Sequence, residues 1–333
     1  MKNLKANIII IFSLFINTSV VITPVMVTAL QAKNFLVLFL NLLFIIAFLL
    51  IFNFDYFKLK WLINSRVLKY VNIIYLLIAM ISIVAGVTLL INNLYYLKTP
   101  LTVVTFALMF ITMIIAFNKK RNFLNLFFIL FAISLLTILL FGLIFPKSLI
   151  KLNFTMVNFK IPYLAVYLIL LLDLIYYKFY FTTRDFNFSF KKQILTIILT
   201  FLVISYFTYK DLTISHLEFN HLYFPNLLKY RVAGCLLDVH LDFIIIIWIL
   251  LGCIFKCVLY GDLTRIIFKK KKNEKFYITF FFIIFFITNT ITNNVNKDNL
   301  LLDIMLQISS IVALITIILL GGYYVACRIH QKE

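Results

Sequence analysis

The sequence predicts an all-α integral membrane protein with ten transmembrane helices, arranged as two inverted repeats of five. Ten apolar segments, each long enough to cross a bilayer, fill most of the 333-residue chain. Hydrophobic residues make up 64% of the chain and charged residues 13%, so no stretch is polar enough for a separate soluble domain. Lys and Arg are also concentrated in every second connection between these segments, as they are in membrane proteins with several spans. We therefore expect a single membrane domain over residues 1–333.

The ten expected spans are the apolar runs that lie between polar or charged connections. In chain order they are Ile8–Leu30, Phe35–Asn53, Val71–Ile91, Pro100–Phe117, Phe123–Phe145, Ile161–Tyr177, Ile194–Thr208, Leu241–Tyr260, Tyr277–Ile291 and Leu302–Val325. The first run follows Lys2 and Lys5, as in a signal peptide, but it exceeds the apolar region of about 7–15 residues that such peptides carry. We therefore interpret it as a retained transmembrane helix.

The distribution of basic residues predicts the topology. With the N-terminus inside, 21 of the 31 Lys and Arg residues fall on the cytoplasmic side and nine on the external side, while Lys256 lies within a span. This bias predicts that both termini are cytoplasmic. The run Lys269–Lys272 is then a cytoplasmic anchor, and the long connection 209–240 is external. Because these connections account for the net charge of +19, we do not expect nucleic acid as a partner.

No pattern in the sequence is typical of a metal, cofactor or nucleotide site. The four cysteines lack paired metal-ligand spacing, and the four histidines form no metal-binding motif. Cys253 and Cys257 lie one helical turn apart in an apolar run, where we expect them to be small buried side chains. We therefore expect neither a metal nor a cofactor.

Ten spans divide into two halves of five, residues 1–150 and 151–333, and an odd number per half makes the halves run in opposite directions. Folds of this kind bind their ligand at mid-membrane, where the first helix of each half is broken. The first span contains Asn17, Thr18 and Ser19 before Pro24, which removes a backbone donor inside an apolar helix. A simple kink at Pro24 is the alternative. The matching sixth span has its only proline at Pro162.

Several motifs, taken in their order along the chain, resemble those of one family. They are Tyr223–Leu228 with Leu241–Phe243, then Trp248–Leu250 and Phe255–Lys256, the sequence Lys98–Pro100 at the start of the fourth span, and Lys119–Arg121 before the fifth. This order resembles the B subunits of the GerA-type spore germinant receptors, which belong to the amino acid, polyamine and organocation transporter superfamily. The resemblance covers essentially the whole chain and implies a LeuT-like fold. The chain departs from the family in lacking glycines between Asn17 and Pro24 and in the sixth span.

The resemblance implies a membrane receptor subunit without enzymatic activity. It would bind a small-molecule germinant, commonly an amino acid, and act with an A subunit and a lipoprotein C subunit in the spore inner membrane. Together with the Pro24 break, it places the pocket between the first, third, sixth and eighth spans. The hydroxyls of Thr18, Ser19 and Thr23 would face the ligand, and Tyr163 and Tyr167 would form an aromatic wall. The alternatives are a secondary amino acid or polyamine transporter and a structural subunit that binds no ligand.

Asp173 and Lys256 are charged residues within two of the expected spans. At ~1.5 Å per residue, they lie roughly 18 Å and 22 Å into the sixth and eighth spans, both of which run inward from outside. Each unpaired charge would cost at least ~2.5 kcal/mol at that depth. We therefore predict that the two form an intramembrane ion pair or share a water-filled pocket. If they are coupled, their rearrangement would transmit ligand binding. The alternative is that both reach the cytoplasmic interface beside Tyr176, Tyr177 and Tyr260.

Overall fold

The computed structural model describes parts of the chain, and every element in those parts is helical. The described residues are 43, 65–94, 99–117, 129, 132, 172–173, 175–180, 198, 242–268, 274–295 and 300–329. The longer helices are α5 (Arg66–Leu94), α6 (Leu101–Phe117), α11 (Asp242–Ile267), α12 (Glu274–Val295) and α13 (Leu300–Ile329). They overlap the third, fourth, eighth, ninth and tenth predicted spans. The other predicted spans, the repeat boundary at residue 150 and the connection 209–240 lie wholly or largely outside the described residues.

Local sequence signals explain where these helices begin. Ser65 precedes α5, and its Oγ accepts a hydrogen bond from the backbone N–H of Leu68 at 3.4 Å, which is the geometry of an N-terminal cap. Pro100 precedes α6, and its carbonyl accepts a bond from the N–H of Val103 at 2.9 Å. Glu274 at the start of α12 places a negative charge at the positive end of the helix dipole. Capping and charge therefore fix three starts that an apolar run alone defines loosely.

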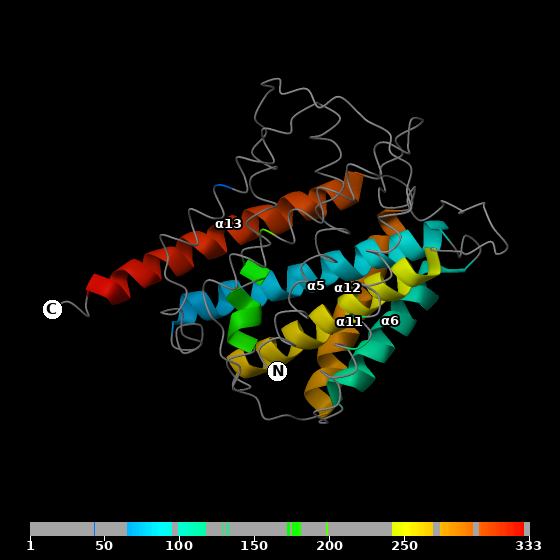
Figure 1. The fold of residues 1–333 in the computed structure, drawn as a ribbon, viewed down its shortest axis with the longest axis horizontal. Coiled ribbons are helices and arrows are strands. Elements are labelled where there is room, and N and C mark those ends of the chain that lie inside the picture. Colours follow the sequence, from blue (N-terminus) through cyan, green and yellow to red (C-terminus); the bar gives the residue numbers. More distant parts are fainter. Residues whose placement is uncertain are drawn as a thin grey trace, which may run out of the picture.

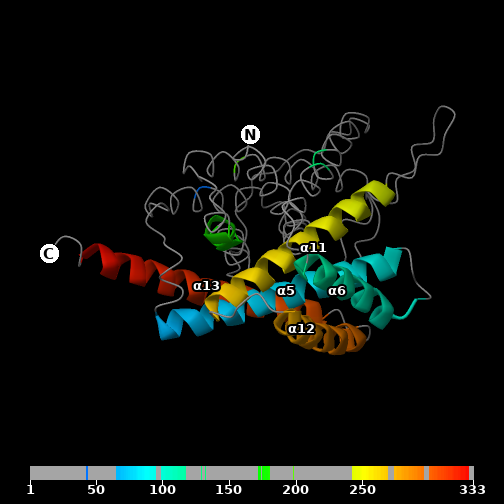
Figure 2. The ribbon, with the colours of Figure 1, turned by 90° about the horizontal axis from the view of Figure 1, so that it is seen from below.

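Helix α5 is the centre of the described bundle. It contacts α6, α11, α12 and α13. In Figure 2, α11 lies on one side of α5 and α12 on the other, while α13 runs beside α5 in Figure 1. In an apolar 18-residue window of the stretch Arg66–Leu89, 78% of the residues are buried, compared with only 33% in such a window of the stretch Glu274–Asn294 of α12. Both stretches are long and apolar enough to cross a membrane.

The outer faces of three helices are apolar as well as exposed. The large hydrophobic side chains exposed on them are Val103, Phe106, Phe110, Ile111 and Ile114 on α6, Ile278, Phe282, Ile283, Phe286 and Ile287 on α12, and Ile308, Ile311, Leu314, Ile315, Ile318 and Val325 on α13. Exposure of so many large apolar side chains is unusual on a monomeric soluble protein. The buried ionisable side chains of α11, Lys256 and Asp262, instead point into the interior.

Helix α11 packs against α12 at a glycine. A Cβ atom added to Gly261 would lie 3.1 Å from Cζ of Phe281 and 3.6 Å from Cε1 of Phe280, closer than ordinary van der Waals contact to the first. Glycine therefore allows the two helices to approach at this level. Gly322 on α13 has open space around the same position.

Candidate functional site

A buried polar cluster joins α5, α11 and a short helical segment, residues 172–173 and 175–180, that we call the Asp173 segment. Its residues follow helical spacing on each element, so each helix presents them on one face. Those on the Asp173 segment are Asp173, Tyr176, Tyr177 and Tyr180, those on α11 are Lys256, Tyr260 and Thr264, and those on α5 are Asn72 and Tyr75. All nine are buried, and the three elements belong to the third, sixth and eighth predicted spans. Three of the four spans expected to border the pocket therefore meet here.

Asp173 and Lys256 form an ion pair at the centre of this cluster. Nζ of Lys256 lies 3.0 Å from Oδ2 of Asp173, and the exposed fractions of the two side chains are 2% and 0%. The structure thus has the contact that the sequence analysis predicted. Both charged side chains are enclosed by protein rather than extended toward solvent, and Tyr176, Tyr177 and Tyr260 are buried with them.

Two tyrosine hydroxyls also contact the Asp173 carboxylate. Tyr260 and Tyr75 both donate to Oδ1, the latter at 3.5 Å, while Lys256 donates to Oδ2. A carboxylate only accepts hydrogen bonds, so three donors on two oxygens suit its ionised form. The Lys256 ammonium also lies 5.1 Å from the ring centroid of Tyr260, within the range of a cation–π interaction.

A second layer of contacts holds these tyrosines in place. The rings of Tyr75 and Tyr176 are stacked with centroids 5.4 Å apart, and the ring of Tyr176 meets that of Tyr260 edge-on at 5.9 Å. Tyr176 donates its hydroxyl to Oδ1 of Asn72, whose amide donates in turn to the carbonyl of Leu68. The orientation of the Tyr75 and Tyr260 hydroxyls therefore depends on side chains from all three elements.

The pair is neutral as a unit but costly to separate. Bringing two charges out of water carries a penalty of several kcal/mol per ion, which mutual attraction and extra hydrogen bonds must offset. Removing one partner of such a pair destabilises a protein by about 3–5 kcal/mol, because the remaining charge stays buried. Any motion that separates α11 from the Asp173 segment must therefore supply a new partner for each charge.

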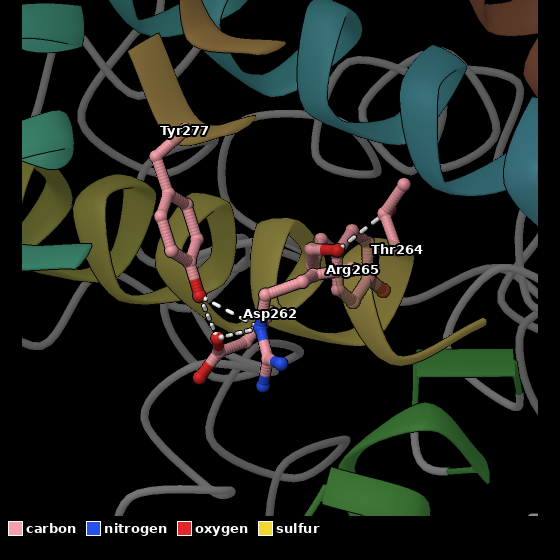
Figure 3. A network of polar contacts seen from close by, with 5 residues as sticks. Asp262, Thr264, Arg265 and Tyr277 are labelled. Carbon is pink, nitrogen blue, oxygen red and sulfur yellow. Dashed lines mark hydrogen bonds and ion pairs between the residues drawn. The ribbon is translucent and has the colours of Figure 1, made fainter. Parts of the chain in front are cut away.

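A second polar cluster lies further along α11, where the helix meets α12. Tyr277 of α12 donates its hydroxyl to Asp262, and Nε of Arg265 lies 3.3 Å from Oδ1 of Asp262 and 3.0 Å from the hydroxyl oxygen of Tyr277. Figure 3 shows the Tyr277 hydroxyl, the Asp262 carboxylate and the Arg265 guanidinium converging on one point. Arg265 is 18% exposed, so this cluster is less enclosed than the first.

The remaining predicted site residues lie outside the described part of the chain. They are Thr18, Ser19, Thr23, Pro24, Pro162, Tyr163 and Tyr167. Sequence reasoning missed Tyr75 and Asn72, which have no charge and lie in an apolar run. The signal that could have found them is their spacing of three residues, which places two polar groups on one face of a helix otherwise rich in Leu and Ile. Cys253 and Cys257 are buried as predicted.

Comparisons of the chain with protein-family models, with curated proteins and with solved structures found no match. The function of the chain is therefore inferred from its own residues.

Proposed function

We propose that the chain is a B subunit of a spore germinant receptor, built as ten transmembrane helices in two inverted repeats of five. The family assignment rests on the order of motifs in the sequence. The membrane location is supported by the exposed apolar faces of α6, α12 and α13, which need lipid or another apolar partner to cover them. Two helices of sufficient length and apolar character agree with this assignment.

The observation that carries the functional proposal is the enclosed Asp173–Lys256 pair. Buried ionisable groups in membrane segments are expensive and are commonly retained for function. The pair links two elements of the second proposed repeat, residues 151–333, and Tyr75 of α5, in the first repeat, donates to the same carboxylate. A ligand that favours one arrangement of these helices over another shifts the balance between two states, and that difference in affinity is all a signal requires.

The proposed partners follow from the family resemblance. The subunit acts with a receptor A subunit and a lipoprotein C subunit in the spore inner membrane, with its N- and C-termini in the cytoplasm. The germinant is a small molecule, commonly an amino acid in this family, and it undergoes no chemical change. The residues proposed to border its pocket are Thr18, Ser19, Thr23, Tyr163 and Tyr167.

A secondary amino acid or polyamine transporter is the second candidate, and the same ion pair favours it. A proton-coupled transporter needs a titratable group within the membrane whose protonation changes with the open side. Asp173 is a carboxylic acid within a predicted span, and it is in contact with the Lys256 ammonium. The two functions differ in whether solute crosses the membrane.

Measuring the germination of spores that lack or carry the gene decides between these functions. Deletion of the gene from its native host is expected to abolish the response of spores to one germinant, and the wild-type gene to restore it. Thr18→Val and Ser19→Val are then expected to raise the germinant concentration needed for a half-maximal response at unchanged protein level. Thr279→Val on the exposed face of α12 is the matched control and leaves the response unchanged. Uptake of labelled solute into vesicles, with germination unaffected by deletion, would instead support transport.

A further inference from the structure

The Asp173 carboxylate has the surroundings of a binding site for an ammonium ion. It lies at the junction of three helical elements, receives hydroxyl groups from Tyr75 and Tyr260, and has the stacked rings of Tyr75 and Tyr176 beside it. A carboxylate supplies the counter-charge for an ammonium group, and aromatic faces within about 6 Å attract cations. The same combination recognises cationic ligands in aromatic cages.

The group that occupies these surroundings belongs to the chain itself. Lys256 reaches Asp173 from α11, and its ammonium lies 3.0 Å from the carboxylate and 5.1 Å from the Tyr260 ring centroid. A lysine side chain is a primary alkylammonium ion on a flexible stem. The two residues are 83 positions apart in the sequence, so their contact depends on how α11 packs rather than on local geometry.

Charge balance makes exchange of this occupant feasible. A free primary ammonium ion that replaces the Lys256 ammonium at Asp173 leaves that carboxylate neutralised and its hydrogen bonds intact. The tyrosine hydroxyls keep their acceptor, because they bond to Oδ1 while the ammonium bonds to Oδ2. A neutral or anionic molecule of the same size cannot do this, since it leaves a buried carboxylate without its cation.

We propose that Asp173, Tyr75 and Tyr260 form an ammonium-binding site that Lys256 occupies from within, and that this site accepts a free primary alkylammonium ion once the Lys256 side chain is withdrawn. The proposal deepens the proposed function, on which it rests, by naming the chemical group through which a ligand engages the pair. Withdrawal of Lys256 by movement of α11 then couples occupancy of the site to the arrangement of the helices.

The test uses a cavity shaped like the missing side chain. Lys256→Ala removes the equivalent of propylammonium, so the full-length variant, purified in detergent, is titrated with propylammonium while its Tm is recorded. We expect Tm to rise by a few degrees in a concentration-dependent and saturable way. The neutral isostere 1-propanol is expected to produce no such rise. Equal effects of the two compounds, or none from propylammonium, would overturn the proposal.

Three further proteins serve as controls. The wild-type protein, whose site holds Lys256, is expected to respond to propylammonium at least tenfold more weakly. Lys69→Ala removes a lysine that lies over the ring of Phe268, at 5.5 Å from its centroid, and is expected not to respond beyond the wild type. In Lys256→Ala with Asp173→Asn the response is expected to disappear, because the counter-charge is gone. A response that persists in this double variant places the amine elsewhere and contradicts the proposed site.

A second measurement covers the case in which Lys256→Ala does not accumulate. Expression with propylammonium in the medium is then expected to restore its abundance in the membrane, and no restoration would contradict the proposal. These readouts do not involve germination. Loss of amine binding with a normal germinant response therefore overturns the ammonium site alone, whereas amine binding without any germinant response overturns the receptor function alone.

Discussion

Helix α11 carries two clusters of the same three kinds of side chain in different surroundings. In the first, Lys256 and Tyr260 meet Asp173 from a distant part of the chain, and the charged side chains are at most 2% exposed. In the second, Asp262 and Arg265 are neighbours on one helix and meet Tyr277 of the next, with Arg265 18% exposed. Enclosure rather than residue type therefore sets the cost of breaking each ion pair. The attraction between the two charges and the penalty of leaving one of them unpaired both grow as water is excluded.

The largest expected effect comes from removing one charge of the enclosed pair. Lys256→Met and Asp173→Asn are each expected to lower the free energy of unfolding by about 3–5 kcal/mol, since each strands a buried charge. The double variant is expected to lose much less than the sum, because it strands none. Unfolding of the purified proteins in detergent measures all three.

The second cluster provides the control for this comparison of single and double variants. Asp262→Asn is expected to lower the free energy of unfolding by about 1 kcal/mol or less, because partial exposure lets water solvate the remaining Arg265. Strictly additive losses for Asp173→Asn and Lys256→Met would show that the two residues act independently. Equal losses at Asp262 and Asp173 would show that enclosure does not distinguish the clusters.

The next effect compares one tyrosine hydroxyl from each cluster. Tyr260→Phe removes a donor to the enclosed Asp173 carboxylate and is expected to cost about 1.5–3 kcal/mol, the range for hydrogen bonds to charged groups. Tyr277→Phe removes the corresponding donor to Asp262 and is expected to cost about 0.5–1.5 kcal/mol, since water can replace part of it. Thermal unfolding of the two variants beside the wild type gives the comparison. A larger loss for Tyr277→Phe would reverse the proposed order.

The sequence predicted the helices in the described part well but not all of their ends. The predicted span Leu241–Tyr260 corresponds to α11, which continues to Ile267. Hydropathy ends the span at Tyr260 because Asp262 and Arg265 follow. The structure continues the helix because these two charges pair with each other three residues apart. Likewise α5 begins at Arg66 rather than at Val71, because Ser65 caps it.

Of the candidate site, the sequence analysis predicted only the charged residues to be in contact. Asp173 and Lys256 stand out because each is costly in an apolar run, and similar depth suggested that they meet. Tyr75 gives no such signal, since tyrosine is common in membrane segments and its role depends on which helix packs beside it. That neighbour is set by tertiary packing, which a pattern within one helix does not encode. The same limit applies to Gly261, whose role depends on Phe281 of α12.

A third prediction concerns the distance between α11 and α12, which Gly261 sets next to the second cluster. Gly261→Val is expected to lower the free energy of unfolding by about 1–2 kcal/mol, because overpacking against Phe281 outweighs the gain in helix propensity. Gly322→Val, where the space is open, is expected to be neutral or slightly stabilising. The same unfolding measurement tests both. Equal effects would show that α12 moves aside at little cost.

The smallest expected effect has the opposite sign and concerns buried threonines outside both clusters. Within the described part of the chain, the hydroxyl of Thr288 on α12 is buried without a hydrogen-bond partner. Thr112 on α6 is buried too, but its hydroxyl donates to the carbonyl of Leu108 at 2.7 Å. Valine has nearly the same shape and helix propensity as threonine, so each Thr→Val change isolates the hydroxyl.

Thr288→Val is expected to raise the free energy of unfolding by up to about 1 kcal/mol, because an unpaired hydroxyl no longer has to be desolvated. Thr112→Val is expected to lower it by about 0.5 kcal/mol, since one net hydrogen bond is lost. Chemical unfolding of both variants under identical conditions resolves the difference in sign. Polar groups in both α11 clusters have partners, so a gain at Thr288 would show that pairing, and not polarity, decides whether a buried group stabilises this bundle. A loss at Thr288 as large as that at Thr112 would mean that its hydroxyl has a partner after all.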